Sequence, residues 1–261
     1  MRRVVAVMVC LTSVALAKPD KKSESKSDKK SDKKSDSKTT KAAKKAASRF
    51  EAPSDVENTA AYKYGSMSPS ECELELDNRK IPFQKETARG VAGAIRLTGA
   101  LHGVTFKADV EEKDRATTPY EIVDCRLALA LDDFAAILEK HDIVEVRHYS
   151  IYRPPPKSWP DDKEGTRHDG AMAIDAAHFV NKDGKSLDVV KHFNGAIGAK
   201  TCGDGAAPDP VTAEATELRS ILCDSVAAHL FNVVLTPNYN KPHHNHFHLE
   251  VTAGVKWFLV H

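Results

Sequence analysis

Two histidines separated by a single residue, His246 and His248, are well placed to bind a metal ion together. Residues 247–251 have the character of a strand, and alternate residues of a strand face the same side. Both imidazoles then project into one space, while Phe247 points into the core. Neutral imidazole is a common zinc ligand, so this pair predicts half of a zinc site.

A second cluster, between residues 166 and 175, supplies the residues that could complete such a site. His168 precedes a predicted strand over residues 171–179, and Asp175 lies within that strand. A loop histidine and a strand carboxylate can converge on one ion if the strands that carry the two clusters are neighbours. Three protein ligands leave a fourth position for water, which is typical of catalytic zinc rather than structural zinc.

The segment before this second cluster is expected to form the helix, strand and loop that position it. Residues 125–141 predict a helix, because their apolar residues fall on one helical face. Residues 143–147 then alternate like a half-buried strand. Three prolines, Pro154 to Pro156, force a loop that runs to about Thr166. A loop of this length beside a strand is often functional.

The segment after the second cluster predicts a hairpin, a helix and two more strands. Residues 181–185 read as a hairpin turn, and residues 187–193 as the antiparallel partner of strand 171–179. Thr212 begins a second helix, and strands follow over 232–235 and 247–251. The expected fold class is therefore α+β, with a small antiparallel sheet that carries the metal and helices packed on one side.

The chain begins with segments that we expect to lie outside the fold. Residues 1–17 have a positive start, an apolar stretch and a small-residue cleavage pattern, which predicts a secretory signal peptide. Residues 18–50 repeat lysine, serine and aspartate and contain almost nothing apolar, which predicts a disordered tether. Residues 51–71 form an extension, and the globular domain spans residues 72–261.

Charge limits the partners that this chain can bind. The formal net charge is +1 at pH 7, and the tether is basic, so the folded remainder must be acidic. We therefore expect no nucleic-acid partner. The tether is either a solvated spacer or an electrostatic contact to an anionic envelope surface. After removal of the signal peptide, no transmembrane segment is expected, and the chain is predicted to be periplasmic or secreted.

Outside the signal segment the chain has four cysteines, an even number that predicts two disulfides in an exported protein. Their order favours the pairs Cys72–Cys125 and Cys202–Cys223, although three pairings are possible. None belongs to a Cys-x-x-Cys pair, so a thiolate zinc site is not expected.

The two histidine clusters resemble a known group of enzymes. The pattern His168-x-x-Ala171-x-Ala173-x-Asp175, followed by His246-x-His248, is similar to that of the LAS zinc peptidases. With His243 added, the second cluster is most similar to the penicillin-insensitive murein endopeptidases. The neighbouring segments 124–128, 149–153 and 237–240 look still more like the bacterial extensin-like C-terminal domain. The resemblance covers roughly residues 72–251.

This resemblance implies a LAS/hedgehog-type peptidase fold and a role for each site residue. His168, Asp175 and His248 would bind Zn2+, and it is the resemblance that favours His248 over His246 as the third ligand. His246 would be the catalytic histidine and His243 an accessory one. Arg153 would contact carboxylate or carbonyl groups of the substrate, for which a guanidinium is suited.

The sequence departs from the family pattern at two positions. Thr166 stands where the family favours serine, which keeps the hydroxyl. Ala171 stands where it favours glycine, with Gly170 one place earlier. If that glycine supplies a positive φ or a close approach, the turn in this chain is expected to differ.

The implied substrate is peptidoglycan, and the implied reaction is hydrolysis of an amide bond in its peptides by a murein endopeptidase. Three alternatives remain open. The chain could be a D,D-carboxypeptidase, which trims peptide ends, or a non-catalytic zinc-containing module that binds the cell wall. It could also be a structural wall-associated protein in which the segment 18–50 does the binding.

Overall fold

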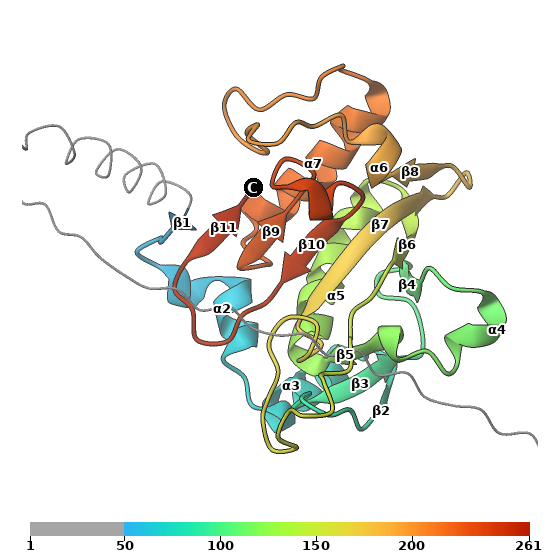
Figure 1. Ribbon diagram of the computed structural model, residues 1–261, viewed down its shortest axis with the longest axis vertical. Coiled ribbons are helices and arrows are strands. Elements are labelled where there is room, and N and C mark those ends of the chain that lie inside the picture. The colour runs from blue at the N-terminus through green and yellow to red at the C-terminus, as the bar shows by residue number, and fades with distance from the viewer. Residues whose placement is uncertain (1–49) are drawn as a thin grey trace, which may run out of the picture. The chain divides into compact units, whose positions relative to one another are not determined.

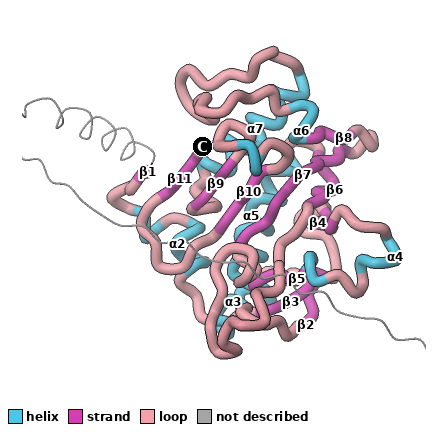
Figure 2. The backbone as a smooth tube through the Cα atoms, in the orientation of Figure 1, coloured by secondary structure: helices cyan, strands magenta, loops and turns pink. Residues whose placement is uncertain are grey.

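The computed structural model describes residues 50–261, so the predicted signal peptide and nearly all of the predicted tether lie outside the described residues. Figures 1 and 2 show the elements of the described part. The strands are β1 (Phe50–Glu51), β2 (Phe83–Lys85), β3 (Ala94–Leu97), β4 (Thr105–Ala108), β5 (Ile122–Asp124), β6 (Ile143–His148), β7 (Ala173–Asn181), β8 (Ser186–Asp188), β9 (Val233–Leu235), β10 (Phe247–Glu250) and β11 (Phe258–Val260). The α-helices are α2 (Ala60–Gly65), α3 (Pro69–Asn78), α4 (Glu112–Arg115), α5 (Cys125–Lys140), α6 (Val189–His192) and α7 (Ala213–Ala227), with 3-10 turns η1 (Val56–Asn58), η2 (Pro119–Glu121) and η3 (Lys241–His243).

The α+β class is confirmed, but the prediction of a small, wholly antiparallel sheet is wrong. The main sheet has eight strands in the order β1-β11-β9-β10-β7-β6-β4, with β8 paired to β7. Two of its pairs, β4 with β6 and β11 with β9, are parallel. Strand β9 confirms the strand predicted over residues 232–235, whereas β11 has only three residues, too few for alternation to reveal it. A second sheet has the order β2-β3-β5.

Helix α5 confirms the helix predicted over residues 125–141. The Asp124 carboxylate accepts a hydrogen bond from the Arg126 backbone N–H, which caps the start of the helix. Its apolar face includes Leu127, Leu131 and Phe134, all of them buried. In Figure 1, α5 and α7 lie behind the main sheet and cover one of its faces. The opposite face is therefore left for the candidate site.

Strand β10 keeps the alternation that the sequence predicted. Phe247 and Leu249 belong to the hydrophobic core, so His246, His248 and Glu250 face the other side.

Strand β7 alternates only up to a bulge. Arg147 pairs with His178, whereas the next residue of β6, His148, pairs with Ala176. Ala177 is therefore an extra residue on β7, and it reverses the alternation. As a result Asp175 and His178, three positions apart, lie on the same face of the sheet.

One predicted strand is partly wrong. The hairpin after β7 exists, but β8 ends at Asp188 and a short helix, α6, replaces the rest of the predicted strand 187–193. The Asp188 N–H donates to His192 Nδ1 at 2.9 Å, and Lys191 donates to the Asp188 carboxylate. These contacts between residues three or four apart require a helical turn and cannot form along a strand.

Both predicted disulfides are present. Cys72 pairs with Cys125 and joins α3 to α5, and Cys202 pairs with Cys223 and joins the loop after α6 to α7. The second disulfide attaches the loop 193–212 to α7. Figure 2 draws this loop as a long pink segment. Within residues 50–261, no helix is both long enough and apolar enough to cross a membrane.

Candidate metal centre

Strands β7 and β10 place a carboxylate and an imidazole opposite each other. His248 pairs with Asp175 in the antiparallel register, and His248 Nδ1 lies 3.0 Å from Asp175 Oδ1. His168, from the loop before β7, brings its Nε2 to 3.1 Å from the same oxygen. Ligand atoms of the three residues lie within 4.8 Å of one another, a spacing that one metal ion can bridge. The three predicted ligands therefore converge.

The loop that carries His168 is tightly closed at its base. A methyl group added to Gly170 would lie 2.3 Å from the carbonyl oxygen of Gly165, so the two glycines pack backbone against backbone. On either side of His168, Arg167 and Ala171 have left-handed φ angles of 52° and 53°. Whether this turn differs from that of the family stays a prediction, but Ala171 itself adopts a positive φ. Alanine keeps the positive φ that suits glycine, at a cost of about 1–2 kcal/mol.

The hydrogen bonds of the two ligand histidines turn their lone pairs towards Asp175. His168 Nδ1 donates to the carbonyl oxygen of Ile151 at 2.9 Å, and His248 Nε2 donates to Glu250 Oε2 at 3.0 Å. A neutral imidazole that uses its single proton in this way presents a lone pair on its other nitrogen. Two lone pairs and a carboxylate oxygen then face one point, which requires positive charge there. This donor set fits a zinc ion.

The electrostatics of the centre also favour a cation. Burial alone would raise the pKa of Asp175, but the imidazoles of His168 and His248 beside it hold it well below its usual range. Burial would likewise raise the pKa of Glu250, but hydrogen bonds from His248 and Thr252 lower it. Burial would lower the pKa of His248, and the two carboxylates beside it, Asp175 and Glu250, raise it instead. Two buried, ionised carboxylates thus flank His248.

His246, the predicted catalytic histidine, lies beside the three ligands. Its Nε2 is 3.3 Å from Asp175 Oδ1, and its Nδ1 is 3.0 Å from Asn245 Oδ1. Burial lowers the pKa of His246 to about 4, so its imidazole is neutral near pH 7. A neutral imidazole in this place can accept a proton.

The two remaining predicted residues, His243 and Arg153, lie at the edge of this cluster, which we call the rim. The His243 ring lies 5.2 Å from that of His246 and 5.8 Å from that of His248, measured between centroids. Burial lowers the pKa of His243. Arg153 forms an ion pair with Asp175 Oδ2, and its side chain is half exposed. All six predicted site residues are therefore brought together.

Sequence reasoning missed the residues that orient these histidines. Glu250 bonds His248 Nε2, and Asn245 bonds His246 Nδ1. Glu250 could have been found, because it continues the alternation that links His246 and His248 on one strand face. The acceptor for His168 is a backbone carbonyl, that of Ile151, and no residue type signals such a partner.

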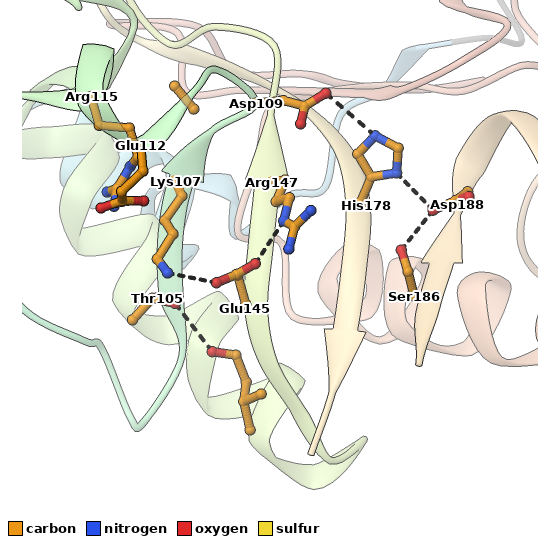
Figure 3. A network of polar contacts seen from close by, with 12 residues as sticks. Thr105, Lys107, Asp109, Glu112, Arg115, Glu145, Arg147, His178, Ser186 and Asp188 are labelled. Atoms are coloured by element: carbon orange, nitrogen blue, oxygen red, sulfur yellow. Dashed lines mark hydrogen bonds and ion pairs between the residues drawn. The ribbon is translucent and has the colours of Figure 1, made fainter. Parts of the chain in front are cut away.

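A second group of charged residues lies on the same face of the sheet, further along β7. His178 Nδ1 lies 2.7 Å from Asp188 Oδ1, and its Nε2 lies 3.7 Å from Asp109 Oδ2. Figure 3 shows His178 between these carboxylates. Its two nitrogens are thus directed to different acids. The group is an ion-pair network that links β7 and β8 to the residue after β4.

Comparison with protein families matches residues 70–259 to the family described as the extensin-like protein C-terminus. No curated protein and no solved structure matches the chain. The matched range contains all six residues of the candidate site.

Proposed function

Because the chain belongs to the family of extensin-like protein C-termini, and because its ligand set fits zinc, we propose that it is a zinc-dependent peptidase. Its substrate in this proposal is the peptide part of peptidoglycan, and its fold is of the LAS/hedgehog peptidase type. The observation that carries the proposal is the convergence of His168, Asp175 and His248 with a fourth, neutral imidazole beside them. A structural zinc site has no need of that extra histidine.

His168 Nε2, an oxygen of Asp175 and His248 Nδ1 would hold the ion. Bound there, zinc would polarise the scissile carbonyl and make water a better nucleophile at neutral pH. Ile151 and Glu250 keep the two ligand imidazoles in the tautomers that metal binding requires.

His246 and Arg153 would act on the substrate side. His246 Nε2 faces the ligand cluster and would accept a proton from the attacking water, then return it to the leaving amine. The Arg153 guanidinium sits at the rim, where half of its side chain is open to solvent. It would bind a carboxylate or carbonyl group of the peptide. His243 would support His246 from its other side.

The choice of a murein endopeptidase among these enzymes rests on the resemblance of the run His243-x-x-His246-x-His248. An endopeptidase cuts a cross-link, whereas a D,D-carboxypeptidase removes a terminal residue. The products from cross-linked and linear muropeptides therefore separate the two activities.

The test combines metal content with hydrolysis in purified wild-type protein and three variants. We expect about one zinc per chain in the wild type, no zinc in His248→Ala, and zinc without hydrolysis in His246→Ala. His244→Ala is the control, because His244 is exposed and its side chain bonds only the Lys241 carbonyl oxygen among residues 50–261. It should keep both zinc and activity.

Two results would count against the proposal. A folded wild type that takes up no supplied zinc would overturn the metal site and with it the peptidase. A zinc-loaded wild type that is inert on cross-linked and linear muropeptides would overturn the peptidase and favour a non-catalytic zinc module instead.

A further inference from the structure

Asn245 lies between the proposed catalytic histidine and a tyrosine from a different strand end. Its Oδ1 is 3.0 Å from His246 Nδ1, and its Nδ2 donates to the Tyr149 hydroxyl oxygen at 3.1 Å. Both functional ends of one side-chain amide are therefore engaged. The amide joins the end of β6 to the start of β10.

The first contact determines which nitrogen of His246 carries the proton. An amide oxygen only accepts hydrogen bonds, so Nδ1 must be the protonated nitrogen. The Nε2 atom then presents its lone pair, and it is this atom that lies 3.3 Å from Asp175 Oδ1. The opposite tautomer would place a proton on Nε2 and leave no lone pair for accepting one.

The second contact determines which way the amide faces. With Nδ2 directed to Tyr149, Oδ1 is directed to the imidazole. Tyr149 is itself held in place, because its N–H donates to the Asp175 carbonyl oxygen at 3.0 Å. Its ring packs edge-on against His246 and His178, with centroids 5.9 and 6.4 Å apart. Burial raises the pKa of Tyr149, so its hydroxyl stays protonated at neutral pH.

The same ring contacts tie this arrangement to the ion-pair network of Figure 3. His178 is fixed by Asp188 on one side, and the bulge at Ala177 brings it to the face that Asp175 occupies. Tyr149 thus packs against a side chain that is itself held by Asp188, which allows it to hold the Asn245 amide in one orientation.

We propose that Asn245, oriented by Tyr149, is the positioning residue that fixes the tautomer and ring orientation of His246. The inference rests on the proposed function, because it assigns His246 Nε2 as the proton acceptor of that reaction. Asn245 makes no contact with His168, Asp175 or His248 among the interactions within residues 50–261. Its effect should therefore fall on His246 and leave zinc binding intact.

The direct test is the tautomer of His246, read from long-range 1H–15N correlation spectra of the zinc-loaded full chain at about pH 8, where a histidine is neutral. We expect the Nδ1–H form in the wild type, a mixture in Asn245→Ala, and the Nδ1–H form again in Asn245→Asp, whose carboxylate still accepts. Tyr149→Phe should reduce the fraction of the Nδ1–H form only partly. Asn78→Ala is the control, because this exposed side chain bonds only Glu75 within the described part of the chain.

Kinetics supply the second readout. Asn245→Ala should lower kcat about 10- to 100-fold with little change in KM, as loss of an orienting partner usually does, and Asn245→Asp should restore most of it. Zinc content should stay equal in all variants.

An Nδ1–H tautomer that persists unchanged in Asn245→Ala would overturn the inference, and so would an Nε2–H tautomer in the wild type. Absence of hydrolysis by the wild type would refute the proposed function. The spectra would still decide whether Asn245 positions His246.

Discussion

Replacing His148 by leucine is expected to make the protein resistant to acid. His148 is the last residue of β6, and its side chain is completely buried. Neither ring nitrogen has a hydrogen-bond partner among residues 50–261. Burial lowers the pKa of His148 from the ordinary value of 6.5 to about 3. The folded protein therefore resists protonation of a group that the unfolded chain protonates readily.

The size and sign of the effect follow from this difference. Between pH 6.5 and pH 3 the unfolded state binds the proton and the folded state does not, so acid favours unfolding. The stability is fully present above pH 6.5 and is lost as the pH falls. A difference of about 3.5 pKa units, at 1.36 kcal/mol per unit, corresponds to a loss on the order of 5 kcal/mol near pH 3.

The assay is urea unfolding of the wild type and His148→Leu at several pH values between 7.5 and 4, with a chelator present so that zinc does not contribute. Leucine has no proton to bind, so the gap in unfolding free energy should widen in favour of the variant as the pH falls. At neutral pH the variant should be at least as stable, since a buried polar group without a partner is removed.

His244→Leu, at an exposed histidine, is the control and should follow the wild type at every pH. A gap between His148→Leu and the wild type that stays constant from pH 7.5 to pH 4 would refute the reasoning. It would mean that His148 is protonated as easily in the folded protein as in the unfolded one.

Three further predictions concern the loop and the strand that hold the candidate ligands. Gly170→Ala should destabilise the fold by about 1–3 kcal/mol, because the new methyl group meets backbone atoms at 2.3 Å. Ala171→Gly should change stability by less than about 1 kcal/mol, since relief of the positive φ offsets a lost methyl group and added chain entropy. Thermal unfolding would measure both, and equal effects at the two positions would contradict this account. Glu250→Gln should weaken zinc binding by about 10- to 100-fold in a chelator competition, because His248 loses a charged partner. Unchanged affinity would show that the carboxylate does not orient the ligand.

Secondary structure can be predicted most closely from the sequence where many consecutive residues follow one pattern. Helix α5 has sixteen residues with a continuous apolar face, so its position could be predicted closely. The pair His246 and His248 needs only the alternation of one strand, and β10 has it. Strand β11 could not be predicted, because three residues carry almost no pattern. Its place beside β9 depends on contacts with residues far away in the sequence.

Orientation of the site residues is harder to predict than their identity. His168, Asp175 and His248 carry recognisable chemistry, but the tautomers of the two histidines depend on Ile151 and Glu250. The first of these contributes only a backbone carbonyl, which every residue type has. A sequence can therefore indicate which residues are candidates to bind a metal while it leaves open which nitrogen each histidine offers.

Alternation along a strand predicts a shared face only as far as the next bulge. Without Ala177, residues 175 and 178 would lie on opposite faces, and strict alternation would assign His178 to the core. The extra residue reverses the pattern, so His178 joins the face of Asp175 and packs against Tyr149. A single inserted alanine, Ala177, thus places His178 on the face of the proposed catalytic centre. Bulges recur beside functional sites because they redirect side chains in this way.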